Sequence, residues 1–160
     1  LDGFTFSRLK PYETWELFRE EARQTWDIYR SIAQPVEVTR ISVRYINRLE
    51  LPLPFEDFRE WILTVPEIAP GLPQQLAGYF FRVNLPFPID QGHAFVNITQ
   101  KIDPQPSESV VSMIFDIDAF NPDSFVPTDE KIWDRFEELR EAKNTVFFKS
   151  ITEKTMIRYK

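Results

Sequence analysis

The sequence predicts an α+β fold, with a single antiparallel sheet of about five strands and helices packed mainly on one face. Two kinds of periodicity carry this prediction. Several stretches alternate apolar and polar residues, as strands do when one face of their sheet is buried. Two longer stretches repeat their apolar residues every three or four positions, as amphipathic helices do. The expected order is strand, helix, strand, helix, three strands and a final helix.

A chain of 160 residues is long enough for one domain with a sizeable core. Its composition, 42% hydrophobic and 15% aromatic, argues against a disordered chain. We therefore expect a single domain over residues 1–160. The chain begins with Leu1 rather than Met, and the residues up to Arg8 already have the pattern of a structured segment. We expect it to be the C-terminal part of a longer protein, whose preceding segment would cover the sheet.

The charge and the residue types exclude several classes of protein. A net charge of -6 and an isoelectric point near 4.9 argue against a general nucleic-acid binder. The lack of cysteine excludes disulfides, thiolate catalysis and zinc–thiolate sites, and it fits a cytoplasmic protein. No run of about eighteen apolar residues is present, so we expect no membrane span. No signal peptide is recognisable.

The N-terminal part predicts a short strand followed by a long helix. Phe4–Arg8 alternates apolar and polar residues, which is typical of a strand. Pro11 suits the first turn of a helix. Apolar residues between Tyr12 and Ala33 recur at spacings of three and four, which predicts a helix of about six turns. Pro35 ends it.

Residues 36–49 form the next predicted strand, and we expect this strand to be the centre of the sheet. One face carries Ile41, Val43, Tyr45, Asn47 and Leu49, and the other carries Arg40, Ser42, Arg44, Ile46 and Arg48. Leu51-Pro52 is expected to break the strand. A short helix then follows around Phe58, and the proline-containing residues 65–73 form an irregular loop.

Three further strands are predicted at residues 76–87, 94–102 and 109–118. The last of them would place Asp116 and Asp118 on the polar face of the sheet. A final helix follows, and Thr128 is expected to cap its start.

The residues Arg40 to Arg48 read R-I-S-V-R-Y-I-N-R. They resemble the motif R-I-x-x-R-Y-I-N-R, which follows an amphipathic helix in a family of uncharacterised, sporadically distributed bacterial proteins. Phe4–Arg8, the pair Tyr12 and Trp15, and the tail Leu139–Thr152 also resemble that family. The resemblance covers most of the chain and implies a bacterial protein with several dozen further residues in front. It implies no reaction, because the family has no established activity.

Arg40, Arg44 and Arg48 form a ladder on the polar face of their strand. Same-face residues lie about 6.6 Å apart, so the ladder spans roughly 27 Å, too far for three side chains to clamp one phosphate. A linear polyanion or an acidic partner surface fits this spacing better. The alternative is that the arginines pair with carboxylates of neighbouring strands, for which Asp116 and Asp118 are the candidates.

Few residues offer catalytic or metal chemistry. Asp116 and Asp118 share a face, as two metal ligands would, but no further carboxylate or histidine is identifiable to converge on them. His93 is the only histidine, and no Ser/His/Asp or zinc-binding motif accompanies it. The four glycines do not cluster into a phosphate loop. We therefore predict no catalytic residue, no metal ion and no cofactor.

Two features indicate binding. Asn47 shares a face with Val43 and Tyr45, so we expect it either to hydrogen-bond to backbone at the strand end or to contact a ligand there. The otherwise polar face also carries apolar residues, whose exposure would mark an interface. These residues are Ile46, Phe80, Phe95 and Ile114.

The predicted function is a non-catalytic binding or regulatory module that acts through this mixed arginine and apolar face, on a protein partner or on a second copy of itself. The residues expected at the binding site are Arg44, Asn47, Arg48, Arg82 and Asp116. The alternative is an enzyme that holds an anionic, phosphate-bearing substrate with Arg44 and Arg48, and uses Asp116 or Asp118 as base or metal ligand. Such an enzyme would gather these groups in one concave pocket. A binding module would hold its arginines in separate pairs on a flat face.

Overall fold

The computed structural model describes residues 3–9, 11, 13–74, 76–90, 92–102 and 109–159. The fold is of the predicted α+β class, with one antiparallel sheet. Contacts along the chain divide it into two compact units. The first consists of Leu1–Val38 with Ser124–Asp129, and the second of Thr39–Asp123 with Glu130–Lys160.

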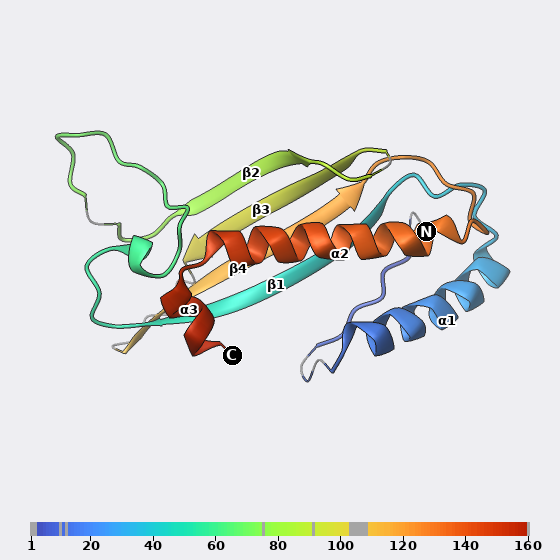
Figure 1. The fold of residues 1–160 in the computed structure, drawn as a ribbon, viewed down its shortest axis with the longest axis horizontal. Helices are drawn as coiled ribbons and strands as arrows, with labels where there is room; N and C mark the ends of the chain where they lie inside the picture. The colour runs from blue at the N-terminus through green and yellow to red at the C-terminus, as the bar shows by residue number, and fades with distance from the viewer. Residues whose placement is uncertain are drawn as a thin grey trace. The chain divides into compact units, whose positions relative to one another are not determined.

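The first unit is built around helix α1, Trp15–Ala33 (Figure 1). Thr14 caps its start, because the Thr14 hydroxyl accepts a hydrogen bond from the Leu17 backbone N–H at 3.3 Å. Gln34 ends the helix in the left-handed conformation, with φ at 45°, directly before Pro35. The predicted helix and its end at this proline are therefore confirmed, but the helix begins at Trp15, so the prediction that Pro11 lies in its first turn is wrong.

The N-terminal strand predicted at Phe4–Arg8 is wrong, because this segment is described and forms no strand. The ring of Phe4 instead packs on Trp26, and that of Phe6 packs on Phe18, with centroids 5.6 and 5.1 Å apart. The alternation in the sequence therefore reflects two rings that pack against α1, and not the pairing of a strand.

The second unit contains the sheet (Figure 1). Its strands are β1 (Ile41–Pro52), β2 (Phe80–Phe87), β3 (Ala94–Ile102) and β4 (Val110–Asn121). They lie in the order β1-β4-β3-β2, and every neighbouring pair is antiparallel. The described chain thus has four strands in its sheet, and not the expected five.

The prediction that β1 forms the centre of the sheet is wrong, because β1 lies at one edge. Strand β4 occupies the central position beside it and pairs with β1 along its whole length. The inward side chains Met113, Phe115 and Ile117 of β4 are fully buried. Alternation identifies which face of a strand is buried, but it does not identify the neighbouring strands.

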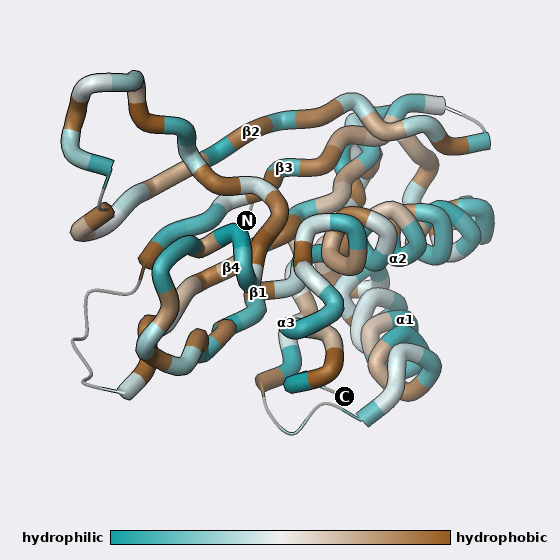
Figure 2. The backbone as a smooth tube through the Cα atoms, turned by 60° about the vertical axis from the view of Figure 1, so that its left-hand side comes forward, coloured by the Kyte–Doolittle hydropathy of each residue, from teal (hydrophilic) through white to brown (hydrophobic). Residues whose placement is uncertain are grey.

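Helix α2, Lys131–Ser150, covers one face of this sheet and contacts β1, β4 and β3 (Figure 1). The buried side chains of Leu139 and Ala142 face the sheet core. The Phe147 ring stacks on the Phe115 ring, with centroids 5.9 Å apart. Figure 2 shows hydrophobic and hydrophilic residues alternating along the strands, as the sequence predicts. Burial of one such large apolar side chain stabilises the fold by about 1.5–3 kcal/mol.

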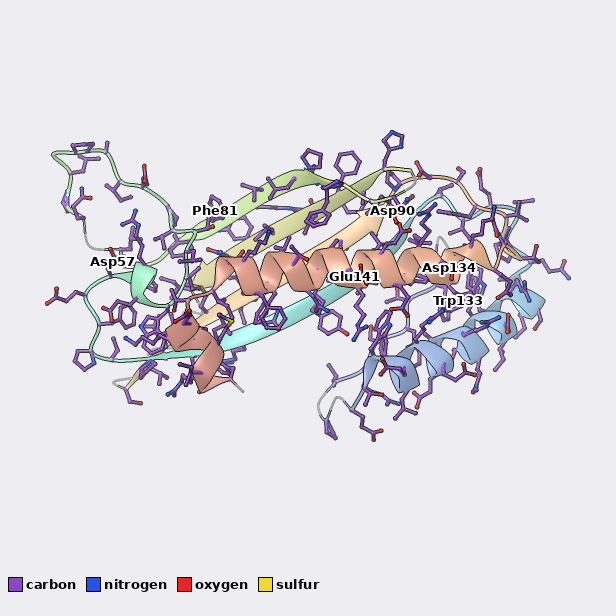
Figure 3. All side chains as sticks on the ribbon, in the orientation of Figure 1. Asp57, Phe81, Asp90, Trp133, Asp134 and Glu141 are labelled. Carbon is purple, nitrogen blue, oxygen red and sulfur yellow. The ribbon has the colours of Figure 1, made fainter. Side chains whose placement is uncertain are left out.

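The start of α2 differs from the prediction. The residue before the helix is Glu130, which makes no capping hydrogen bond, so the cap expected at Thr128 is wrong. Asp134 lies in the first turn, where a negative charge is favourable for the helix dipole. Asp134 and Glu141 are exposed on α2, whereas Trp133 is buried (Figure 3).

The long connection between β1 and β2 is held at the C-terminal end of α2. It contains the 3-10 helix η1, Phe58–Glu60, and no regular element at residues 65–73, as predicted. Ile62 forms a backbone bridge with Ile151. Helix α3, Glu153–Arg158, adds the Thr155 hydroxyl, which donates to the Trp61 carbonyl at 2.6 Å. None of the helices in the described part of the chain has the length and apolar character needed to cross a membrane.

Candidate functional site

The face of the sheet opposite α2 is termed the outer face. Its side chains are Ser42, Arg44, Ile46, Arg48 and Glu50 of β1, Ser112, Ile114, Asp116, Asp118 and Phe120 of β4, Phe95, Asn97, Thr99 and Lys101 of β3, and Phe80, Arg82, Asn84 and Pro86 of β2. Arg40 belongs to the same face, because its guanidinium lies 4.5 Å from the centre of the Phe120 ring. Four of the five predicted binding residues are thus brought to one face.

Arg44 and Asp116 form an ion pair with two hydrogen bonds on this face. The Arg44 Nε and Nη2 atoms donate to the two Asp116 carboxylate oxygens at 2.9 and 2.6 Å. The residue directly across from Arg44 is Asp118, so the guanidinium reaches diagonally along β4. The hydrogen bonds to Asp116, with a further contribution from Asp118, raise the pKa of Arg44 above its ordinary value. Arg44 and Asp116 are therefore hydrogen-bonded and charge-paired with each other.

The other two arginines of the ladder have separate partners. Arg40 Nη2 lies 2.8 Å from the Asp118 carboxylate. Arg48 donates to the Ser112 hydroxyl at 3.2 Å, and its Nε atom lies 3.7 Å from the Glu50 carboxylate. The expected pairing with Asp116 and Asp118 is therefore confirmed for Arg44 and Arg40, whereas Arg48 contacts Ser112 and Glu50 instead.

The half of the outer face formed by β3 and β2 is different. Thr99 lies across from Arg82, and Phe80 lies across from Lys101. Among the residues that the structure describes, neither Arg82 nor Lys101 makes an ion pair or a hydrogen bond. No outer-face position of β2 or β3 carries a carboxylate. Lys101 was not among the predicted binding residues, because its proximity to Arg82 depends on the register of β2 and β3.

The two halves therefore differ in charge. The β1–β4 half has three cations, which are Arg40, Arg44 and Arg48, and three carboxylates, which are Glu50, Asp116 and Asp118. The β3–β2 half has the two cations Arg82 and Lys101 and no carboxylate. The outer face has a net charge of +2, on a chain whose net charge is -6.

The predicted apolar patch is divided into separate parts. Ile46 on β1 is 63% exposed, and Phe80 on β2 is 68% exposed. Asp116 and Thr99 occupy the two strands between β1 and β2 at the level of Ile46. Phe95 is half-buried and stacks on Phe120, with ring centroids 5.6 Å apart. The outer face thus offers two exposed apolar side chains, one near each edge of the sheet.

Asn47 is the predicted binding residue that the structure does not bring to the outer face. Its side-chain amide donates to the Phe115 carbonyl of β4 at 3.1 Å, on the face that α2 covers. The expectation that Asn47 hydrogen-bonds to backbone is therefore confirmed, but the bond does not lie at the strand end, because β1 continues through Leu51 to Pro52. This bond links β1 to β4 across the edge pair.

Lys143 on α2 is a buried cation that was not among the predicted site residues. It is 8% exposed, and its ammonium lies 3.5 Å from the centre of the Tyr45 ring. Burial, together with a smaller contribution from the nearby Arg140, lowers the pKa of Lys143 to about 8. The available signal was its spacing, because Lys143 follows the buried Leu139 by four positions.

His93 takes part in hydrogen bonds that link the residue before β3 to the segment that follows β4. Its backbone N–H and its ring Nδ1 both lie 3.2 Å from Asp123 carboxylate oxygens, and the Asn121 amide donates to the same carboxylate at 3.2 Å. Burial acts to raise the pKa of Asp123, but these hydrogen bonds outweigh it and hold the pKa below its ordinary value. Gly92 has φ at 84°, and a Cβ atom there would clash with the Asp123 carboxylate.

His93 also lines a pocket of about 330 Å³, together with apolar side chains at positions 86–89 and 94–95. None of the predicted binding residues Arg44, Arg48, Arg82 and Asp116 lines this pocket. Within the described ranges, no three His, Asp or Glu side chains are arranged to hold a metal ion.

Comparison with protein-family models, curated proteins and solved structures finds no match for this chain. The function therefore has to be argued from the outer face.

Proposed function

We propose that this chain is a non-catalytic binding module of the bacterial family that it resembles, and that it binds a protein partner through the outer face. The supporting observation is an open sheet face on which Ile46 and Phe80 are largely exposed, while the polar groups of β1 and β4 are paired with one another. Exposed apolar side chains within a polar surround are typical of protein interfaces. The cysteine-free sequence supports a cytoplasmic location.

The paired arginines support binding by a surface whose side chains are already ordered before the partner docks. Arg44 is held by two hydrogen bonds to Asp116, and Arg40 is held both by Asp118 and by the Phe120 ring. Side chains that are already ordered lose little conformational entropy when a partner docks on them. The β1–β4 half is therefore suited to form a rigid part of an interface.

The same pairing disfavours the enzyme alternative. A substrate held by Arg44, with Asp116 as its base, would need both side chains to be available. Each is instead the other's partner, through charge-assisted hydrogen bonds that are roughly twice as strong as neutral ones. The pairs lie along the strands of an open sheet face, which is the arrangement expected of a binding surface.

Site-specific photocrosslinking tests this proposal. Ile46 and Phe80 are each replaced by benzoylphenylalanine in the full chain, which is expressed and irradiated in its source cells. The matched control places the same group at Phe148, an exposed side chain of α2. Both outer-face positions are expected to yield a discrete adduct with one protein, and the control position is not.

The mass of the adduct identifies the kind of partner. An adduct of twice the 19.0 kDa chain would show that the partner is a second copy. Equal labelling from Ile46, Phe80 and Phe148, or no adduct from the outer face, would contradict the proposal.

A further inference from the structure

We infer that the free edge of β2 is a docking site for an extended, acidic segment of a partner protein, which adds to the sheet as a fifth strand. This inference rests on the proposed function and specifies the chemistry of the partner. Three features carry it: the place of β2 at the end of the sheet, the cations Arg82 and Lys101, which have no partner among the described residues, and the exposed ring of Phe80.

The backbone of β2 has hydrogen-bonding groups that face away from the sheet. The Tyr79 carbonyl accepts from the Ile102 backbone N–H at 3.3 Å, so Tyr79 faces β3. Backbone groups alternate in direction along a strand, which places those of Phe80, Arg82 and Asn84 on the free edge. Among the described residues, no backbone partner occupies these positions.

Pro86 fits this assignment, because it falls at the next outward position of β2. Proline has no N–H to donate and is therefore found on edge strands, where no ladder hydrogen bond is lost. The row of outward-facing backbone hydrogen-bonding groups on β2 is therefore short, and it ends at Pro86. An added strand would gain its main-chain hydrogen bonds from residues 80–84.

The side chains at this edge select an acidic segment. Residues paired across two strands point to the same face, so a residue opposite Arg82 would extend onto the outer face beside that guanidinium. Arg82 and Lys101 lie diagonally across β2 and β3, about 7–8 Å apart by strand geometry, and neither has an anionic partner among the described residues. A carboxylate opposite Arg82 would supply one.

Phe80 selects an apolar residue next to that carboxylate. It lies two positions from Arg82 on the same face and is 68% exposed. A residue two positions along the docked segment would cover its ring. The preferred segment therefore has an acidic and an apolar residue separated by one position. A second copy of this chain would not supply this pattern through β2, because the one charged side chain of β2 is Arg82 and β2 has no carboxylate.

Fluorescence anisotropy with short labelled peptides tests the inference on the full chain. In the probe, threonine occupies every second position, and glutamate and valine alternate at the positions between. Replacement of glutamate by lysine gives the charge control, and polyglutamate gives a control for attraction by charge alone. The glutamate–valine probe is expected to bind at least about tenfold more tightly than either control.

Backbone methylation of the probe separates strand addition from docking on the flat face. Methyl groups on the glutamate and valine nitrogens block the N–H groups that would face β2. Methyl groups on the threonine nitrogens block those that face solvent. The first set is expected to abolish binding, and the second set is not. Equal effects of the two sets would overturn the inference.

Charge-reversal variants of the protein provide a second test of the inference. Lys101→Glu and Arg82→Glu are each expected to weaken probe binding by about tenfold. Lys149→Glu makes the same change of charge as Lys101→Glu at an exposed position of α2 and is expected to leave affinity within about twofold. A thermal melt shows that each variant is folded, and Arg82→Gln serves where reversal prevents folding.

Equal loss of affinity in Lys149→Glu, polyglutamate binding as tight as that of the probe, or equal binding of a labelled oligothymidylate would overturn the inference. Its failure is distinguishable from failure of the proposed function. A probe that does not bind, together with adducts from Ile46 and Phe80, would reject strand addition alone. A lack of adducts from the outer face would reject the proposed function itself.

Discussion

The β1–β4 half and the β3–β2 half of the outer face both carry cations, but among the described residues only the cations of the first half have carboxylate partners. Arg40 and Arg44 reach Asp118 and Asp116 because β4, which carries both carboxylates, is the immediate neighbour of β1. Arg82 has Thr99 on its neighbouring strand instead. A cation on a sheet is therefore neutralised from within only where the next strand supplies a carboxylate. In the half that lacks one, Arg82 and Lys101 have no carboxylate partner among the described residues.

The largest expected effect concerns the connection that holds the β3–β2 half in place. Gly92→Ala should destabilise the fold by about 2–3 kcal/mol, because the new Cβ would displace an Asp123 carboxylate that His93 and Asn121 hold. Urea unfolding measures the loss. Gly71→Ala is the control, since Gly71 also has a positive φ, 92°, but a Cβ there meets nothing within 4 Å. Equal losses in the two variants would reject the role assigned to Asp123.

Lys143 extends the comparison, because it has no carboxylate partner among the described residues and is largely buried. Lys143→Met should stabilise the fold by roughly 1–2 kcal/mol at pH 7, because it removes a buried charge and keeps the volume. This figure is reduced from the full value of the pKa shift, since the ammonium retains some contact with solvent. An unchanged or lower free energy of unfolding in the variant would show that the cation–π contact with Tyr45 outweighs the cost of burial.

The same residue predicts a dependence on pH. Burial lowers the pKa of Lys143 in the folded state to about 8, whereas an unfolded lysine has a pKa of about 10.4. The unfolded chain therefore binds more protons between these values, and the free energy of unfolding should rise as pH increases from about 8 towards 10. Urea unfolding at several pH values measures this rise. The rise should be absent in Lys143→Met.

The paired half is tested by a double-mutant cycle on Arg44 and Asp116. Asp116→Asn should cost about 1 kcal/mol, because Asp116 is 15% exposed and loses two charge-assisted hydrogen bonds. When Asp116→Asn is combined with Arg44→Gln, the coupling energy between the two substitutions should also be about 1 kcal/mol. A coupling energy near zero would show that the pair adds no stability and would remove the contrast between the two halves.

The smallest effect is expected in the unpaired half. Arg82→Gln should change the free energy of unfolding by less than about 0.5 kcal/mol, because no described residue pairs with Arg82. Urea unfolding next to Arg44→Gln provides the comparison. A loss in Arg82→Gln as large as that in Arg44→Gln would mean that Arg82 has a structural role of its own.

Much of the fold was predictable because the alternation of apolar and polar residues is a property of each short segment of sequence by itself. The inward residues of β4 and the polar positions of Asp116 and Asp118 follow from the sequence, and so does the long N-terminal helix. The position of β1 at the sheet edge did not follow, since the order of strands depends on contacts between distant segments. Phe4 and Phe6 show a second limit. Their alternation is the same whether the rings meet a sheet or a helix.

The candidate site was predictable in part for the same reason. The pairing of Arg44 with Asp116 required only that the two residues share a face and lie on neighbouring strands. The open position of Lys101 beside Arg82 required the register of β2 on β3. Lys143 repeats the spacing of buried residues in α2, but a lysine at such a position is as readily directed to solvent by its long stem.

Tyr159 of the C-terminal segment affects how copies of this sheet assemble. Its hydroxyl lies 2.5 Å from the Glu50 backbone nitrogen and donates to the Glu50 carbonyl at 3.1 Å, so it occupies a ladder position on the outer edge of β1. If both sheet edges were open, β1 of one copy would pair with β2 of the next, and this head-to-tail contact would repeat into a filament. A copy that paired along the whole of β1 would have to displace Tyr159 from the Glu50 position. The corresponding groups of Phe80, Arg82 and Asn84 on β2 have no such partner among the described residues.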